Sequence, residues 1–93
     1  MIKSFKCKET AKIWDSGDSR RFSADIVKRA IIKLAMLNRS VTLHDLNIPP
    51  SNHLEKLSGN REGQFSIRIN DQFRVCFRWT ENNAEDVEIV DYH

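Results

Sequence analysis

The chain has 93 residues, of which 40% are hydrophobic and 30% are charged. This length and composition predict one globular domain over residues 1–93 and exclude an intrinsically disordered chain. No apolar run approaches the ~18 residues of a transmembrane helix, and the first residues lack the apolar stretch of a secretory signal. We therefore expect a cytoplasmic protein that makes no contact with a membrane.

Charge is divided unevenly along the chain, although the formal net charge is only +2. Residues 1–40 hold ten Lys and Arg against four Asp and Glu, a net charge of +6, and residues 41–93 hold five against nine, a net charge of −4. A basic half favours an anionic partner such as nucleic acid, although a solvated helix surface explains it equally well. Cys7 and Cys76 are too few for a disulfide scaffold and lack metal-ligand spacing, so neither a metal nor another cofactor is expected.

The first half of the chain reads as a short strand followed by two helices. Residues 1–5 carry the apolar anchors of a strand, and residues 8–14 suggest a short helix. The clearest helix covers residues 23–38, where Ser23 is a favourable N-cap. Its predicted buried stripe consists of apolar residues at helical spacing, namely Val27, Ala30, Ile31, Leu34 and Leu37. Its solvent-exposed face carries three candidate RNA contacts: Lys28, Arg29 and Lys33.

The second half reads as an irregular segment followed by three antiparallel strands. Residues 40–63 are expected to be irregular, because two adjacent prolines, Pro49 and Pro50, block a regular helix. Apolar and polar residues alternate over residues 64–70 and 73–79 and again from Val87. This is the period of half-buried strands.

Strand alternation also predicts how these strands pair, because a slip of one residue would move every side chain to the wrong face. A three-residue loop at 70–72 keeps the apolar residues of the first hairpin on one face and sets Arg68 opposite Arg74. The second hairpin, paired so that its apolar face stays intact, is predicted to contain the pairs Phe77–Ile89, Trp79–Val87, Arg78–Glu88, Cys76–Val90 and Arg74–Tyr92. Arg68, Arg74 and Tyr92 are therefore expected in one row on an open sheet face, with His93 at its end.

This predicted row has the side chains needed to cleave an RNA backbone. Two opposed arginines repel each other, and a bound phosphate would offset that repulsion; alternatively, the arginines project into water or pair with Glu88 and Asp71. A phenol and an imidazole can exchange protons with the 2′-hydroxyl and the leaving oxygen. No metal is required, because the 2′-hydroxyl of RNA is the internal nucleophile. His93 is the first candidate for proton transfer and His53 a further one, whereas His44 is expected to be a surface residue.

Five segments of the sequence resemble one known family. They are residues 1–5, the 57–63 turn with its Gly-Asn-Arg-Glu-Gly motif, residues 65–70, residues 73–77 and the terminal Asp91-Tyr92-His93. In these segments the chain resembles the RelE/ParE toxin superfamily, and within it the HigB-like toxins of bacterial type II toxin–antitoxin systems. The resemblance implies an α+β, RelE-like fold with two N-terminal helices packed on a curved antiparallel sheet. It also implies an mRNA interferase, an endoribonuclease that cuts mRNA in the ribosomal A site.

The resemblance further implies roles for individual residues. The catalytic residues that it implies are Arg74, Asp91, Tyr92 and His93. HigB-like enzymes can also carry a histidine and a lysine ahead of the glycine turn, where this chain has Glu55 and Ser58. His53 and Lys56 are two residues from those positions and are candidate additional catalytic residues. The remaining candidate phosphate contacts are Arg61, Arg68 and Arg78.

The partners implied by the resemblance are an antitoxin, the ribosome and its mRNA. The antitoxin would be HigA-like, with a helix-turn-helix domain through which the complex binds operator DNA. Two alternatives remain: a non-enzymatic ParE-like inhibitor of gyrase, and a plain RNA-binding module that uses the basic helix surface. The Tyr92-His93 pair favours the nuclease, because a protein that only binds its target has no need of it.

Overall fold

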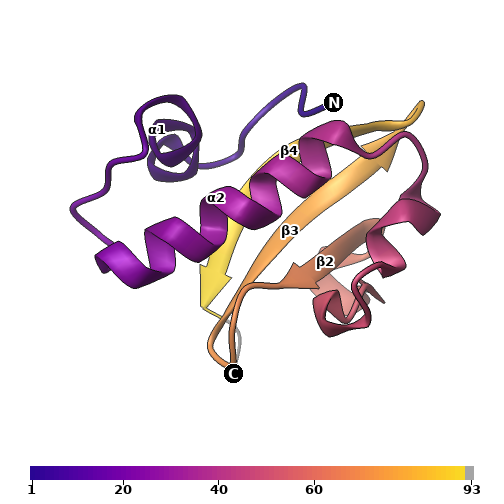
Figure 1. Cartoon of the computed structure of the whole chain (residues 1–93). Helices are drawn as coiled ribbons and strands as arrows, with labels where there is room; N and C mark the ends of the chain where they lie inside the picture. The colour runs from indigo at the N-terminus through magenta and orange to yellow at the C-terminus, as the bar shows by residue number, and fades with distance from the viewer. Residues whose placement is uncertain (92–93) are drawn as a thin grey trace.

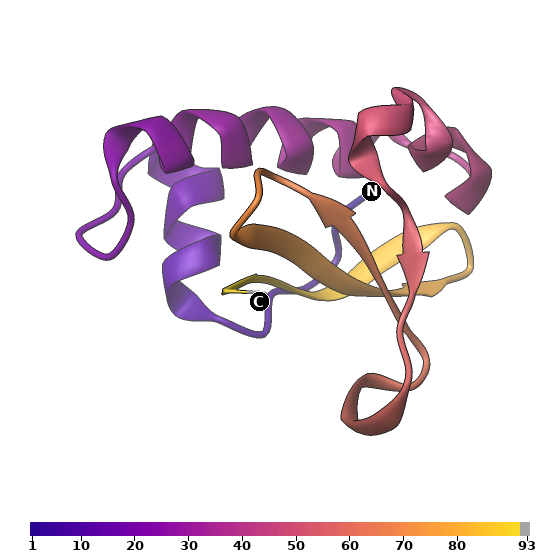
Figure 2. The same cartoon turned by 90° about the horizontal axis from the view of Figure 1, so that it is seen from below.

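The structure, a computed structural model, describes residues 1–91. Its two α-helices are α1 (Lys8–Ser16) and α2 (Ala24–Arg39). They precede a four-stranded antiparallel sheet with the order β1-β2-β3-β4, made of β1 (Glu55–Lys56), β2 (Gln64–Arg68), β3 (Phe73–Thr80) and β4 (Asn83–Asp91). Figures 1 and 2 show α2 lying across one face of the sheet and α1 beside it near β4. The expected α+β fold is confirmed, and no helix in residues 1–91 is long and apolar enough to cross a membrane.

The core lies between α2 and the sheet. The helix begins at the predicted cap, where the Ser23 hydroxyl accepts a hydrogen bond from the N–H of Ile26 at 3.3 Å. Ile31 is only partly buried, whereas the other four residues of the predicted stripe are buried. From the sheet, the core receives Ile67, Ile69, Val75, Phe77, Ala84, Val87 and Ile89. Burial of this apolar stripe is what holds α2 on the sheet.

The segment between α2 and β2 is irregular, as expected, apart from one element that the sequence did not predict. It contains three short 3₁₀-helices, η1 (Leu43–Asn47), η2 (Pro50–Asn52) and η3 (Gly59–Arg61). Between η2 and η3 lies β1, which is only two residues long and pairs with β2 at the edge of the sheet. A strand this short offers too few residues for alternation to reveal it.

The first residues lie along β4 and form isolated bridges to it in place of the short strand expected at residues 1–5. Ile2 and Phe5 make isolated parallel bridges to β4. Farther along, the N–H of Ile89 donates to the Thr10 hydroxyl at 3.1 Å, so α1 continues the contact. An unpaired strand edge invites association with other chains. The N-terminal segment covers this edge.

The register of the β2–β3 hairpin is confirmed. Phe65 pairs with Phe77, Ile67 with Val75, and Arg68 with Arg74. The Asn70 side chain accepts hydrogen bonds from the N–H groups of Gln72 (2.9 Å) and Phe73 (2.8 Å), which stabilises the three-residue loop.

The predicted register of the β3–β4 hairpin is wrong, by two residues at its open end and by three next to the turn. Arg74 is the Cα partner of Val90 and not of Tyr92. The strands turn through Glu81 and Asn82, both of which have positive φ values, 51° and 64°. Two-residue turns of this handedness match the twist of antiparallel strands, so this turn fixes the register. The longer loop that alternation favoured is not formed.

A β-bulge divides the same hairpin. Cys76 pairs with Glu88 but Arg78 pairs with Glu85, so β4 contains one residue more than β3 between these pairs. Asp86 lies in the bulge with a φ of 51°. The tight turn already pairs Arg78 with Glu85 and not with the predicted Glu88. The inserted residue, which alternation cannot anticipate, then sets Glu88 opposite Cys76.

Replacing Glu81 by asparagine should stabilise the protein, because asparagine tolerates the left-handed conformation that glutamate adopts here at a cost. We expect a gain of about 0.5–1 kcal/mol, or roughly 4 °C in Tm for a domain of this size. Thermal unfolding followed by circular dichroism measures it. Glu85→Asn is the matched control, since Glu85 lies in β4 and has no positive φ. An equal gain in the control would contradict the explanation.

Candidate functional site

The sheet face that points away from α2 carries Arg68 and Arg74, the two arginines predicted to lie opposite each other. Register places Ser66, Arg68, Arg74, Cys76 and Glu88 on it. The face was expected to be open, but its centre is covered: Ser66 and Cys76 are fully buried and Arg74 is 8% exposed. Burial raises the pKa of the Cys76 thiol, which keeps this cysteine protonated and unreactive. The sheet centre is thus largely shielded from solvent, with Arg74 as its most exposed residue.

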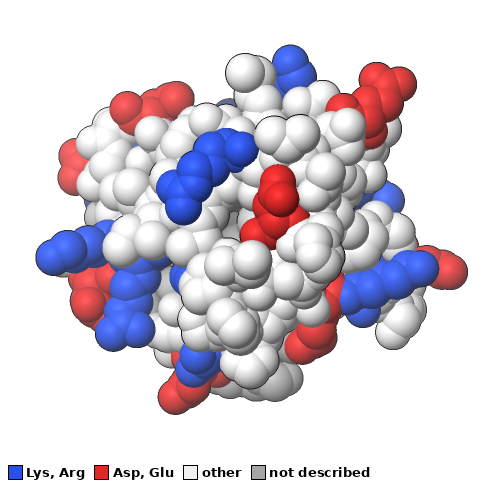
Figure 3. All heavy atoms as spheres, turned by 45° about the vertical axis from the view of Figure 1, so that its right-hand side comes forward, with Lys and Arg blue, Asp and Glu red and all other residues white. Residues whose placement is uncertain are grey.

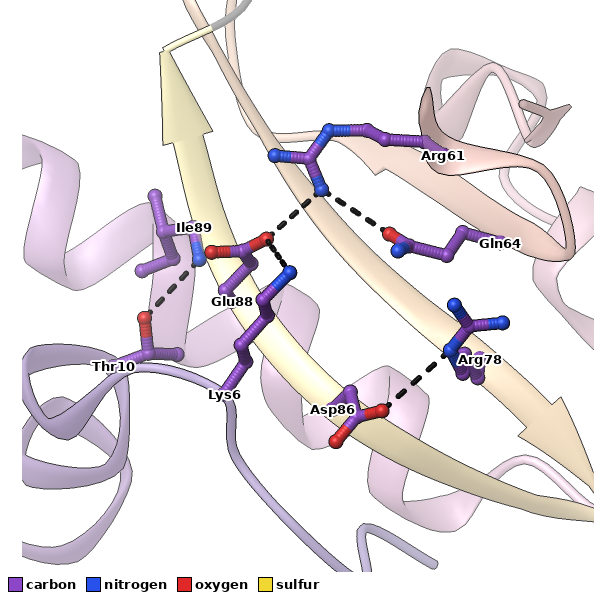
Figure 4. Close-up of polar contacts among 8 residues, drawn as sticks. All are labelled: Lys6, Thr10, Arg61, Gln64, Arg78, Asp86, Glu88 and Ile89. Carbon is purple, nitrogen blue, oxygen red and sulfur yellow. Dashed lines mark hydrogen bonds and ion pairs between the residues drawn. The ribbon is translucent and has the colours of Figure 1, made fainter. Parts of the chain in front are cut away.

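Arg61 crosses this face from the turn before β2 to β4, as Figure 4 shows. Its Nη1 donates to Gln64 Oε1 at 3.1 Å and to Glu88 Oε1 at 2.8 Å. Lys6 Nζ lies 3.9 Å from the same oxygen of Glu88. Because the Glu88 side chain is only 17% exposed, this pair is less screened by water than a surface ion pair. Arg61, predicted to bind phosphate, is therefore engaged within the protein.

Two glycines shape the turn that carries Arg61. Gly59 begins η3 with a φ of +63°, and Gly63 follows it with a φ of +87°. A Cβ on Gly59 would meet no atom within 4 Å, whereas one on Gly63 would lie 3.0 Å from Arg78 Nη1. The Gly-Asn-Arg-Glu-Gly motif is therefore explained by two left-handed backbone positions that glycine adopts without strain.

Arg74 is held by groups of the protein itself. Its Nε donates to Ser66 Oγ at 2.8 Å, and its Nη2 donates to the backbone carbonyl of His53. Its Nη1 lies 3.7 Å from Glu55 Oε1. The structure thus brings together Arg74 and His53, two of the predicted catalytic residues, although the contact to His53 is through its backbone. The His53 side chain is exposed.

The two opposed arginines turn toward different carboxylates. Arg68 pairs with Asp71, as one alternative anticipated, whereas Arg74 pairs with Glu55 and not with Glu88. The Arg68 side chain is 34% exposed and the Arg74 side chain only 10%. Arg68 is consequently the more accessible of the two to an external phosphate.

Register separates two further candidates from Arg74. Lys56 is the Cα partner of Phe65, and Asp91 is the Cα partner of Phe73. Both phenylalanines pack against the core, so Lys56 and Asp91 belong to the opposite face of the sheet. Asp91 is exposed and accepts a hydrogen bond from the Gln72 side chain at 3.1 Å.

The other predicted residues lie apart from this cluster. Tyr92 and His93 fall outside the residues that the structure describes, so their roles stay predictions. Arg78 pairs with Asp86 at 3.5 Å, near the bulge. His44 lies in η1 and is exposed, as expected. The residues that sequence reasoning missed are the two partners of Arg74, Ser66 and Glu55. The confirmed β2–β3 register already places Ser66 on the face of Arg74, whereas only the unpredicted pairing of β1 with β2 would have indicated Glu55.

The three basic residues predicted for α2 lie on the helix that covers the opposite face. Figure 3 shows that basic and acidic side chains are interspersed with uncharged surface over the face it displays. Arg29, for example, lies 3.4 Å from Asp25 across one helical turn. In this view there is no continuous basic field.

Comparison with known proteins identifies relatives over nearly the whole chain. Residues 3–93 match the family model described as the RelE-like toxin of the type II toxin–antitoxin system HigB. Toxin HigB-1 of Vibrio cholerae is 34% identical over 85 residues, covering 90% of each chain. A protein of Proteus vulgaris named Endoribonuclease HigB is 30% identical over 93 residues, covering 100% of each. In the YoeB–YefM complex from Staphylococcus aureus, the matching chain has a TM-score of 0.63 at 18% identity, covering 100% of this chain and 98% of that chain, which supports the fold.

Gly59→Ala should lower the free energy of unfolding by about 1–2 kcal/mol, entirely through the backbone, because the added Cβ meets nothing. Gly59→Asn should lose less, since asparagine adopts the left-handed conformation more readily. Urea unfolding of the two variants beside the unmodified protein measures both values. Equal losses would contradict the backbone explanation.

Arg74→Lys should also destabilise the protein, because an ammonium group cannot reproduce the two-sided contact to Ser66 and His53. We expect a loss of about 1–3 kcal/mol, the range for hydrogen bonds to charged groups. The matched control is Arg78→Lys, which alters a half-exposed ion pair and should change stability by less than about 0.5 kcal/mol. Urea unfolding decides the matter: if Arg74→Lys proves as stable as the control, Arg74 does not anchor the loop at His53.

Proposed function

The chain belongs to the HigB family of RelE-like toxins of type II toxin–antitoxin systems, and from this premise we propose that it is an mRNA endoribonuclease. The proposed reaction takes place in the A site of the ribosome. It uses the 2′-hydroxyl of the RNA as the internal nucleophile. The proposed partner that restrains the toxin is a HigA-like antitoxin with a helix-turn-helix domain, and operator DNA is bound only through that antitoxin. An antitoxin partner is in keeping with the YoeB–YefM complex on the same fold.

The observation that best supports this proposal is the set of three arginines on the sheet face: Arg61, Arg68 and Arg74. They are supplied by a turn and by two neighbouring strands, and each is held by a partner within the protein. Guanidinium groups fixed in advance can stabilise charge that develops on a phosphate without reorganising at the moment of reaction. They also match the planar geometry of phosphate oxygens.

In the proposed reaction, side chains of this chain accept and donate every proton that is transferred. The 2′-oxygen forms a bond to phosphorus while the bond from phosphorus to the 5′-oxygen breaks, which leaves a 2′,3′-cyclic phosphate and a 5′-hydroxyl. One side chain takes the proton of the 2′-hydroxyl and another donates a proton to the leaving oxygen. We assign one of these transfers to His93, with Tyr92, Asp91 and His53 as the candidates that assist it. Tyr92 can alternatively stack on a base.

We assign positioning of the RNA to the ribosome. Residues 41–93 carry nine acidic against five basic side chains and include the whole sheet. An acidic region weakens the binding of free RNA, whereas an RNA strand already held in the A site is presented to the enzyme at high effective concentration.

The test is primer extension on a defined mRNA in a reconstituted translation reaction, with and without ribosomes. We expect cleavage within A-site codons by the unmodified protein, and a loss of at least about 100-fold in His93→Ala, which is typical of a general acid or base. His53→Ala measures the contribution of the second histidine.

The matched control is His44→Ala, which removes an exposed histidine of η1 and should leave cleavage unchanged. Intact mRNA with every variant, together with retained affinity for RNA, would overturn the nuclease and indicate a plain RNA-binding module. Cleavage that persists in His93→Ala would remove that residue from the mechanism.

A further inference from the structure

A pocket of about 300 Å³ lies between α2, η2 and the end of β2. Its lining residues are Arg29, Ile32, Lys33, Ser51, Arg68 and Ile69. Three of these six are cations and none is a carboxylate. The pocket therefore combines an apolar wall with a concentration of positive charge.

Lys33 is oriented by a buried amide. Its Nζ lies 2.6 Å from Asn52 Oδ1, and Asn52 is fully buried. The amide nitrogen of Asn52 donates to the carbonyl of Leu46 at 3.1 Å, so its oxygen must point to Lys33. Among residues 1–91, no carboxylate lies within ion-pair distance of Lys33. The ammonium group thus has a neutral acceptor and an uncompensated charge.

The surroundings of Lys33 disfavour that charge. Burial lowers the pKa of the Lys33 ammonium, and the nearby Arg68 guanidinium lowers it further. Two like charges that face one pocket repel each other, and an anion bound between them would relieve the repulsion. The pocket is therefore poised to gain more from an anion than an isolated surface lysine would.

The other two cations have partners that a stronger anion can displace. Arg29 lies 3.4 Å from Asp25, whose side chain is 70% exposed. Arg68 pairs with Asp71, whose side chain is 98% exposed. Ion pairs with carboxylates this exposed contribute little free energy. Arg68 also faces Arg74 across the β2–β3 hairpin, so it belongs to the pocket and to the arginine cluster of the candidate site.

We propose that this pocket is a second phosphate-binding site, in which Lys33, Arg68 and Arg29 hold a backbone phosphate of the same RNA strand that reaches Arg74. The inference deepens the proposed function and rests on it. Arg68 connects the two sites, so the strand would pass from the sheet face around the edge of β2 toward α2. Binding one additional phosphate outside the reaction centre would fix the direction of the strand.

The experiment measures the affinity of the full chain for a fluorescent 2′-O-methyl RNA by anisotropy over a series of salt concentrations. This RNA lacks the nucleophile and cannot be cleaved, so the readout does not depend on catalysis. We expect Lys33→Gln to reduce the slope of log K against log salt by about 0.7, the value for one phosphate on single-stranded RNA. Lys33→Arg should restore the slope. In the double variant Lys33→Gln/Arg68→Gln, the slope should fall by less than the sum of the falls in the two single variants, because both residues bind the same phosphate.

The matched control is Lys12→Gln, which removes the same charge from an exposed position on α1 and should leave the slope unchanged. Circular dichroism and thermal unfolding verify that each variant is folded. Equal slopes for all folded variants would overturn the proposal. In a further outcome, inorganic phosphate competes with chloride for the pocket while the salt slopes of RNA binding are equal for all variants. In that case the pocket binds free phosphate, and the proposal that it binds RNA is overturned.

Failure of the proposed function is distinguishable from failure of this inference. Loss of mRNA cleavage concerns the reaction, whereas the salt slopes on uncleavable RNA concern only the phosphate contact. A slope that changes with Lys33→Gln in a protein that cuts no mRNA would support the pocket and contradict the nuclease.

Discussion

The register of β3 against β4 is the constraint on which the candidate site depends. The turn through Glu81 and Asn82 sets this register, and the bulge at Asp86 then shifts it by one residue. These two backbone features place Glu88 beside Cys76, within reach of Arg61. Without the bulge, Glu88 would lie at another position along the strand and Arg61 would lose its partner. The position of Glu88 beneath Arg61 therefore follows from the backbone geometry of the turn and the bulge.

The arginines of this sheet face have two roles, to stabilise the fold and, as proposed, to bind phosphate, and each role requires the same guanidinium groups. Arg61 and Arg74 stabilise the fold through acceptors within the protein, and the same guanidinium groups are the proposed contacts to RNA phosphate. A group held in place by its own protein loses little freedom when it meets a ligand, which favours preorganisation. It must, however, share or exchange its partners to bind that ligand. Arg68, which is more exposed and paired with an exposed carboxylate, meets this condition most easily.

The sequence predicted the features that depend on local or periodic physics. The Ser23 cap, most of the stripe of α2 and the Arg68–Arg74 pair all follow from capping chemistry and alternation. Alternation failed at the second hairpin, because a tight turn and an inserted residue shift the register without altering the pattern of apolar residues. It also missed Glu55 and Ser66 as partners of Arg74, since that arrangement depends on a two-residue strand and on a long-range contact to His53.

The pairing of the first residues with β4 has a consequence for how the chain is made. Ile2 bridges to Ala84, and the N–H of Val87 donates to the carbonyl of Ser4 at 3.1 Å. These contacts join Ile2 and Ser4 with strand residues that are synthesised more than eighty positions later. Such long-range closure is slow to form and comes late in folding. A nascent or prematurely terminated chain that lacks β4 cannot close the sheet, so synthesis itself delays the appearance of the folded toxin until its last strand is complete.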